Sequence, residues 1–212
     1  MRTGSLDLHR KPSSGAGTEE LLLSSANSKW AMDCSPDGRF LVYCADGTTG
    51  IGDDLWILPL NPNGSVAGET YQFQQTEFDE DDACFSPDGR WLAYASSESG
   101  DFEVYVRPFP GPGGKWQIST NGGDFPKWRR DGRELYYVSN GNIMMSVEVD
   151  GRGESFIAGQ PKPLFPVRMP LTNKPYDVTG DGQRFMVVTR EAGVAASWIN
   201  VVVNWNAELT TK

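Results

Sequence analysis

Short hydrophobic runs recur along the chain, and four of them follow an Asp-Gly pair. The segment Ser-Pro-Asp-Gly-Arg precedes Phe-Leu-Val-Tyr at residues 40–43 and Trp-Leu-Ala-Tyr at residues 91–94. Weaker copies follow Asp131 and Asp181, so that the four pairs, which begin at residues 37, 88, 131 and 181, are spaced by 51, 43 and 50 residues. A repeat of 40 to 50 residues indicates that one supersecondary unit is used several times.

Each repeat contains further segments with the pattern of β-strands. A second run follows at 54–60, 103–109, 142–149 and 199–205, and shorter strand-like segments follow at 71–76, 115–119 and 163–167. Hydrophobic and polar residues alternate in the segment 104–107, as expected for a sheet with two different faces. Four strands per repeat predict an all-β fold, a β-propeller of four-stranded antiparallel blades. The chain holds about four blades, at 26–76, 77–122, 123–168 and 169–212, in a single propeller over residues 1–212.

The turn that opens each repeat has a defined requirement. An Asp-Gly pair between two strands predicts a tight hairpin turn with positive φ angles. We therefore expect Gly38 and Gly89 to occupy conformations that a β-branched residue would adopt only with strain.

Composition agrees with a turn-rich β chain and excludes several function classes. The 24 Gly and 14 Pro residues leave little room for helices. A net charge of −9 argues against a nucleic-acid partner, and the sequence contains no apolar run long enough to predict a membrane span. The three cysteines, Cys34, Cys44 and Cys84, have no Cys-x-x-Cys spacing, so we expect free thiols.

The repeat resembles that of a known family. The Ser-Pro-Asp-Gly-Arg core followed by Asp-Leu-Trp-Ile at 54–57 or Glu-Val-Tyr-Val at 103–106 is similar to the TolB-like, WD-like propeller repeat. The segments 98–110, 113–123 and 128–135 and the ending 203–205 resemble the C-terminal propeller of bacterial serine/threonine kinases and related sensor proteins. The resemblance implies a module of a larger sensor-type protein, extracytoplasmic if that protein is membrane-anchored and cytoplasmic if the chain is expressed as it stands.

Propellers of this family usually have six or more blades, which raises the question of how this one is completed. Residues 6–11 and 20–24 have the pattern of the third and outer strands of an earlier blade. The segment 20–24 can instead close the blade around Asp181, either within one chain or in a homodimer joined through terminal strands. Since unpaired strand edges recruit other chains, the sequence predicts a homo-oligomer.

Alignment of the repeats on their Asp-Gly pairs predicts which residues face the central channel. The innermost strand precedes each pair, and the charged positions on it are candidates for ligand binding: Asp33, Glu80, Asp81, Asp124, Lys127, Lys174 and Asp177. The acidic run that contains Asp79, Asp81 and Asp82 is a weak candidate for calcium, although it lacks the EF-hand pattern. We expect no cofactor and no resident metal.

These residues favour a non-catalytic function. His9 is the single histidine of the chain and no Gly-x-Ser-x-Gly segment occurs, so a classical catalytic triad has little support. The leading hypothesis is a binding and assembly module whose propeller face is a platform for a protein or peptide partner. The alternative is a hydrolase, an esterase or glycosidase, that uses Glu80, Asp81 and Asp124 as acid and base in the channel.

Overall fold

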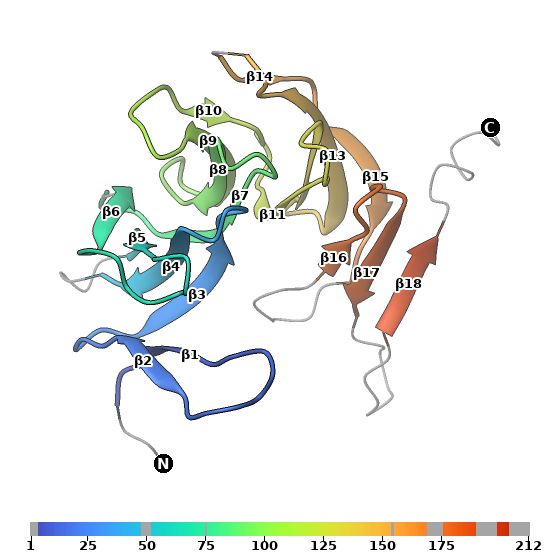
Figure 1. Cartoon of the computed structure of the whole chain (residues 1–212). Coiled ribbons are helices and arrows are strands. Elements are labelled where there is room, and N and C mark those ends of the chain that lie inside the picture. The colour runs from blue at the N-terminus through green and yellow to red at the C-terminus, as the bar shows by residue number, and fades with distance from the viewer. Residues whose placement is uncertain are drawn as a thin grey trace, which may run out of the picture.

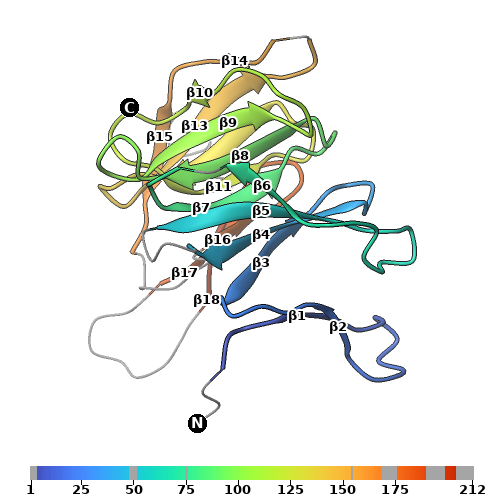
Figure 2. The ribbon, with the colours of Figure 1, turned by 90° about the vertical axis from the view of Figure 1, so that its left-hand side faces the viewer.

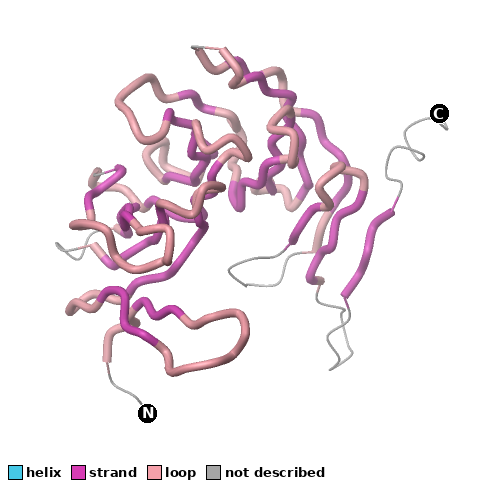
Figure 3. The backbone as a smooth tube through the Cα atoms, in the orientation of Figure 1, coloured by secondary structure: helices cyan, strands magenta, loops and turns pink. Residues whose placement is uncertain are grey.

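The fold is built from β-strands alone in the part of the chain that the structure describes. The computed structural model describes residues 4–47, 52–74, 76–153, 155–168 and 176–189, together with the backbone of 199–203. Within these ranges the chain forms strands and turns and no helix (Figure 3). The strands make a series of antiparallel sheets that follow one another around an arc, with one strand of each sheet turned toward its centre (Figure 1). The chain is a β-propeller, as its repeats predict.

The first two blades are complete four-stranded sheets in chain order. Blade 1 consists of β3 (Lys29–Cys34), β4 (Phe40–Asp46), β5 (Asp53–Pro59) and β6 (Tyr71–Gln74). Blade 2 consists of β7 (Glu80–Phe85), β8 (Trp91–Ser96), β9 (Glu103–Pro108) and β10 (Trp116–Gln117). In both, the strand before the Asp-Gly pair is the innermost one.

The next two blades depart from the four-stranded pattern. Blade 3 contains β11 (Asp124–Trp128), β12 (Glu134–Val138) and β13 (Ile143–Asp150), and β13 pairs with both β14 (Ile157–Ala158) and β15 (Lys162–Pro166). Blade 4 contains β16 (Tyr176–Val178), β17 (Arg184–Val188) and β18 (Ile199–Val203), three strands among the described residues. One edge of β18 therefore has no partner strand in the described part of the chain.

The N-terminal segment forms a small sheet of its own. Strand β1 (Leu8–Arg10) pairs with β2 (Glu20–Leu23) in antiparallel order, and this sheet packs on blade 1. Within one chain, β2 thus does not close the blade around Asp181, so the self-closing arrangement is not the one found. The β1–β2 sheet and blade 4 lie at the two ends of the arc (Figure 1), and the side view shows β1–β2 set apart beyond β3 (Figure 2).

The Asp-Gly turns have the expected glycine conformation but a different turn geometry. Gly38, Gly89, Gly132 and Gly182 have φ angles of 70° to 72°. The preceding aspartates are not in the positive-φ region, because the turn begins two residues before each of them. Gly38 N–H donates to Ser35 O at 2.8 Å, and the Asp37 carboxylate accepts from the Ser35 hydroxyl and from Arg39 N–H. The turn thus needs the aspartate as a side-chain hydrogen-bond acceptor, and it needs a glycine because the next residue has a positive φ angle.

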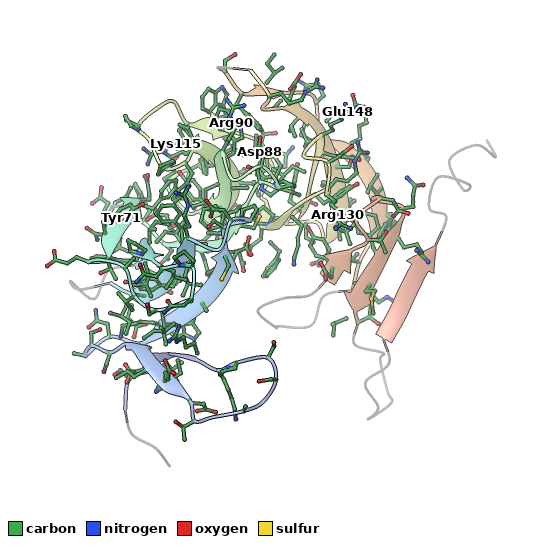
Figure 4. All side chains as sticks on the ribbon, in the orientation of Figure 1. Tyr71, Asp88, Arg90, Lys115, Arg130 and Glu148 are labelled. Carbon is green, nitrogen blue, oxygen red and sulfur yellow. The ribbon has the colours of Figure 1, made fainter. Side chains whose placement is uncertain are left out.

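The hydrophobic core lies between the blades. One cluster joins blades 1 and 2 around Tyr94, another joins blades 2 and 3 around Trp91, and a third joins blades 3 and 4 around Phe185. Figure 4 places Tyr71, Lys115 and Glu148 along the outer side of the arc. Packing of each blade on the next holds the innermost strands side by side.

Candidate functional site

A pocket lies where the innermost strands of the four blades meet. Strand β7 contacts both β3 and β11, and the pocket between them has a volume of about 220 Å³. Side chains from β3, β7, β11 and β16 and from the turn after β7 line it: Met32, Asp33, Asp82, Ala83, Cys84, Phe85, Pro87, Phe125, Pro126, Lys127, Trp128 and Tyr176. We call it the axial pocket. It combines aromatic walls with a few charged groups, as ligand sites usually do.

Irregularities in the innermost strands decide which side chains reach the pocket. The register of β3, β7 and β11 shifts at equivalent places, where each strand carries a β-bulge. Two bulge residues, Asp82 and Phe125, have positive φ angles of 52° and 56°. A bulge turns side chains away from strict alternation, and a non-glycine residue with positive φ marks local strain. For this reason Asp82 lines the pocket, although the repeat alignment selects its neighbour Asp81.

Two carboxyl groups from neighbouring blades form a pair at the pocket. The side chains of Asp82 and Asp124 lie within hydrogen-bonding reach of each other, and a bond between two carboxyl groups needs a proton on one of them. The Asp124 carboxylate also accepts from Phe125 N–H at 2.9 Å. Burial raises the pKa of Asp124, and the bonds from Asp82 and Phe125 oppose that rise only in part. The pKa of Asp124 therefore lies above that of an isolated aspartate.

The other polar groups of the pocket link adjacent blades. The Asp33 carboxylate accepts from Phe85 N–H at 2.9 Å and from Cys34 N–H at 2.8 Å. The Lys127 ammonium lies 3.3 Å from the Asp177 carboxylate.

Three further bonds cross between blades at this level. The Cys84 thiol donates to Pro126 O at 3.1 Å, the Trp128 indole N–H donates to Cys84 O, and the Tyr176 hydroxyl donates to Phe125 O at 2.8 Å. These bonds make the pocket walls a continuous, pre-organised framework. Burial also raises the pKa of the Cys84 thiol well above its usual value, which keeps the thiol neutral and a poor nucleophile.

The structure brings together five of the residues that the sequence selected. Asp33 and Lys127 line the axial pocket, Asp177 pairs with Lys127, and Asp124 pairs with Asp82. Among the described residues, no group of three His, Cys, Asp or Glu side chains could hold a metal ion. The described residues also include no helix that could span a membrane.

Four other candidates lie elsewhere. Glu80 is fully buried, where its carboxylate accepts from the Thr76 and Ser96 hydroxyls, so it is not a solvated channel residue. The Asp81 carboxylate accepts from Asp82 N–H, and the Asp79 carboxylate accepts from Asp53 N–H. Lys174 lies outside the described residues.

Charge is unequally distributed between the two ends of the propeller axis. At the Asp-Gly end, arginines pair with acids of the same turns, as in Arg39–Asp37 and Arg129–Asp131. The opposite end, where the innermost strands begin, carries a group of carboxylates, of which Glu98 pairs with Lys115: Asp46, Asp53, Asp79, Asp81, Asp82, Glu98, Asp101 and Asp124. Burial and the negative charges of Asp46, Asp81 and Asp79 raise the pKa of Asp53, as expected where acids crowd together.

Comparison with known proteins agrees with the fold. No family model matches the chain. An uncharacterized protein of Agrobacterium fabrum is 28% identical over 140 residues, which cover 64% of this chain and 44% of that protein. The crystal structure of TolB from Acinetobacter baumannii matches with a TM-score of 0.51 and 16% identity, over 88% of this chain and 54% of that one.

An enzyme has a similar structure. The puromycin-hydrolyzing peptidase of Mycobacterium tuberculosis matches with a TM-score of 0.64 and 21% identity, over 94% of this chain and 34% of that one. The chain thus spans about half or less of the length of these proteins. At these identities the likeness concerns the fold, and propellers of this kind serve both binding proteins and enzymes.

Proposed function

We propose that this TolB-like propeller is a non-catalytic binding module and that its axial pocket receives part of a protein or peptide partner. The observation that carries the proposal is the pre-organised pocket, whose walls are fixed by hydrogen bonds between blades. A rigid site loses little conformational entropy when it binds. In this proposal the module belongs to a larger sensor-type protein, in keeping with the resemblance of its repeats to kinase-linked propellers.

The test is a selection of displayed random peptides against the whole chain. Met32 lines the pocket, so Met32→Trp should fill it and reduce the affinity of selected peptides at least tenfold. Ile157→Trp is the control, because Ile157 is 63% exposed on β14, away from the axis. Circular dichroism verifies that both variants fold. Selected peptides that bind Met32→Trp as well as the parent chain would contradict the proposal.

The alternative of a hydrolase is supported by one observation, the Asp82–Asp124 pair. Two neighbouring carboxyl groups can act as acid and base. In this alternative Asp82 and Asp124 have these roles, and Glu80, which is buried, has none. A panel of chromogenic esters and glycosides separates the two functions. Turnover that is lost in both Asp82→Asn and Asp124→Asn would establish the hydrolase and refute the binding module.

We further propose that two copies associate through their terminal sheets. Both ends of the arc carry exposed hydrophobic side chains, with Leu21 57% exposed on β2 and Met186 47% exposed on β17. In a homodimer, β2 of one copy would lie along β18 of the other. Light scattering should give twice the chain mass of 23.3 kDa, and deletion of residues 1–24 should abolish the dimer. A concentration-independent mass of one chain would refute this association.

A further inference from the structure

The described residues that line the axial pocket include more acidic than basic side chains. Its lining includes two carboxyl groups, those of Asp33 and Asp82, and one ammonium group, that of Lys127. The Lys127 charge is offset by Asp177, which lies 3.3 Å away. The side chain of Asp82 in turn contacts a further carboxyl group, that of Asp124. Among the described lining residues, carboxyl groups thus outnumber ammonium groups, and the ammonium of Lys127 is paired with Asp177.

The remaining walls are apolar and aromatic. Phe85, Phe125 and Trp128 line the pocket together with Met32 and Pro87. Trp128 is held in place because its indole N–H donates to Cys84 O at 3.3 Å. A volume of about 220 Å³ admits a group of side-chain size. Aromatic faces attract cations, and carboxylates form charge-assisted hydrogen bonds with N–H donors.

From this arrangement we propose that the axial pocket binds the ammonium or guanidinium end of a lysine or arginine side chain presented by a peptide partner. The inference rests on the proposed function and specifies the chemistry of the partner. The cation would contact Asp82 and Asp33, while its apolar stem would pack against Phe125 and Trp128. The acidic end of the axis would steer a basic segment toward the pocket, since clefts of one charge sign focus the field on their ligands.

Asp124 acts as a positioning residue in this inference. Its hydrogen bond to Asp82 holds that carboxyl at the pocket, across the gap between blades 2 and 3. A bound cation favours the ionised form of both carboxyls, so binding expels the shared proton. Affinity should therefore increase as the pH rises through the pKa of Asp124, which burial raises above its ordinary value.

The test uses the full chain and capped pentapeptides that differ only in a central lysine, norleucine or glutamate. Binding is measured by calorimetry and by the NMR signal of the Trp128 indole N–H. The lysine peptide should bind at least tenfold more tightly than the other two and should shift the Trp128 signal. Asp82→Asn should reduce its affinity about tenfold or more, and Asp124→Asn should remove the pH dependence. Glu69→Gln, which removes the same charge from an exposed loop outside the acidic end, should change affinity less than twofold.

The outcomes distinguish this inference from the proposed function. If the norleucine peptide shifts the Trp128 signal and the lysine peptide does not, the pocket binds a peptide but the cationic class is wrong. If none of the peptides shifts the signal, the inference fails, and the peptide selection described above decides the binding module independently. Butylamine is a second probe, and binding as tight as that of the lysine peptide would support the cation site and overturn the peptide as its source.

Discussion

The repeated Asp-Gly turn allows one substitution to be compared in two surroundings. Gly38 and Gly182 occupy equivalent positions with φ angles of 70° and 72°. A Cβ atom added at Gly38 would meet no atom within 4 Å, whereas one at Gly182 would lie 2.3 Å from the Tyr136 hydroxyl oxygen. The backbone strain of an alanine is thus equal at the two sites, and only the steric contact differs.

The expected magnitudes follow from this difference. A left-handed alanine costs about 1–2 kcal/mol, and the lower entropy of its unfolded chain offsets roughly 0.4–1 kcal/mol. Gly38→Ala should therefore lower the free energy of unfolding by about 0.5–1.5 kcal/mol. Gly182→Ala must in addition displace the Tyr136 side chain, which is fully buried and donates to Glu134 at 2.9 Å. Loss of a hydrogen bond to a charged group and a strained rotamer add about 2–4 kcal/mol.

Urea unfolding followed by tryptophan fluorescence measures both variants, and thermal unfolding checks them at about 2–4 °C per kcal/mol for a chain of this size. Gly182→Ala should lose at least 1.5 kcal/mol more than Gly38→Ala. Equal losses would refute the contact between the fourth turn and Tyr136, and a neutral Gly38→Ala would refute the assigned turn conformation.

Two further substitutions test the packing between blades. Burial raises the pKa of Glu80 above its unfolded value, so the stability that its proton provides is complete below pH about 4 and is lost as the pH rises through the raised folded pKa. Glu80→Gln should remove this decline and be more stable than the parent at pH 8 in urea titrations; a less stable variant at that pH would contradict the assignment. Trp91 donates from its indole N–H to Gly151 O at 2.9 Å and is 4% exposed. Trp91→Phe should leave that carbonyl unpaired and cost about 1–3 kcal/mol in the same assay, and a loss below 0.5 kcal/mol would show that the bond is not needed.

The blade pattern could be predicted because it depends on local chemistry. Ser35, Asp37 and Gly38 specify their turn through bonds within six residues, and the apolar runs after each turn are the short continuous runs of buried strands. The repetition of this signal at four places predicted both the strand order and the stacking of blades. The same local signal could not fix the number of strands in blade 3, where β13 is long enough to pair with two short strands.

The candidate site depended on contacts that no local pattern records. Alignment of the repeats selected Asp81, but a bulge with positive φ at Asp82 brings that neighbour to the pocket, where Asp124 of blade 3 is its partner. Likewise, Glu80 was expected to face the central channel but is buried, where the hydroxyls of Thr76 and Ser96 take the place of water around its carboxyl group. The sequence by itself determined the repeated unit, its turns and its hydrophobic faces, since these arise from neighbours along the chain. The tertiary structure alone decided which carboxyl groups meet, because the two groups lie on strands of adjacent blades and the bulges in those strands set the direction of their side chains.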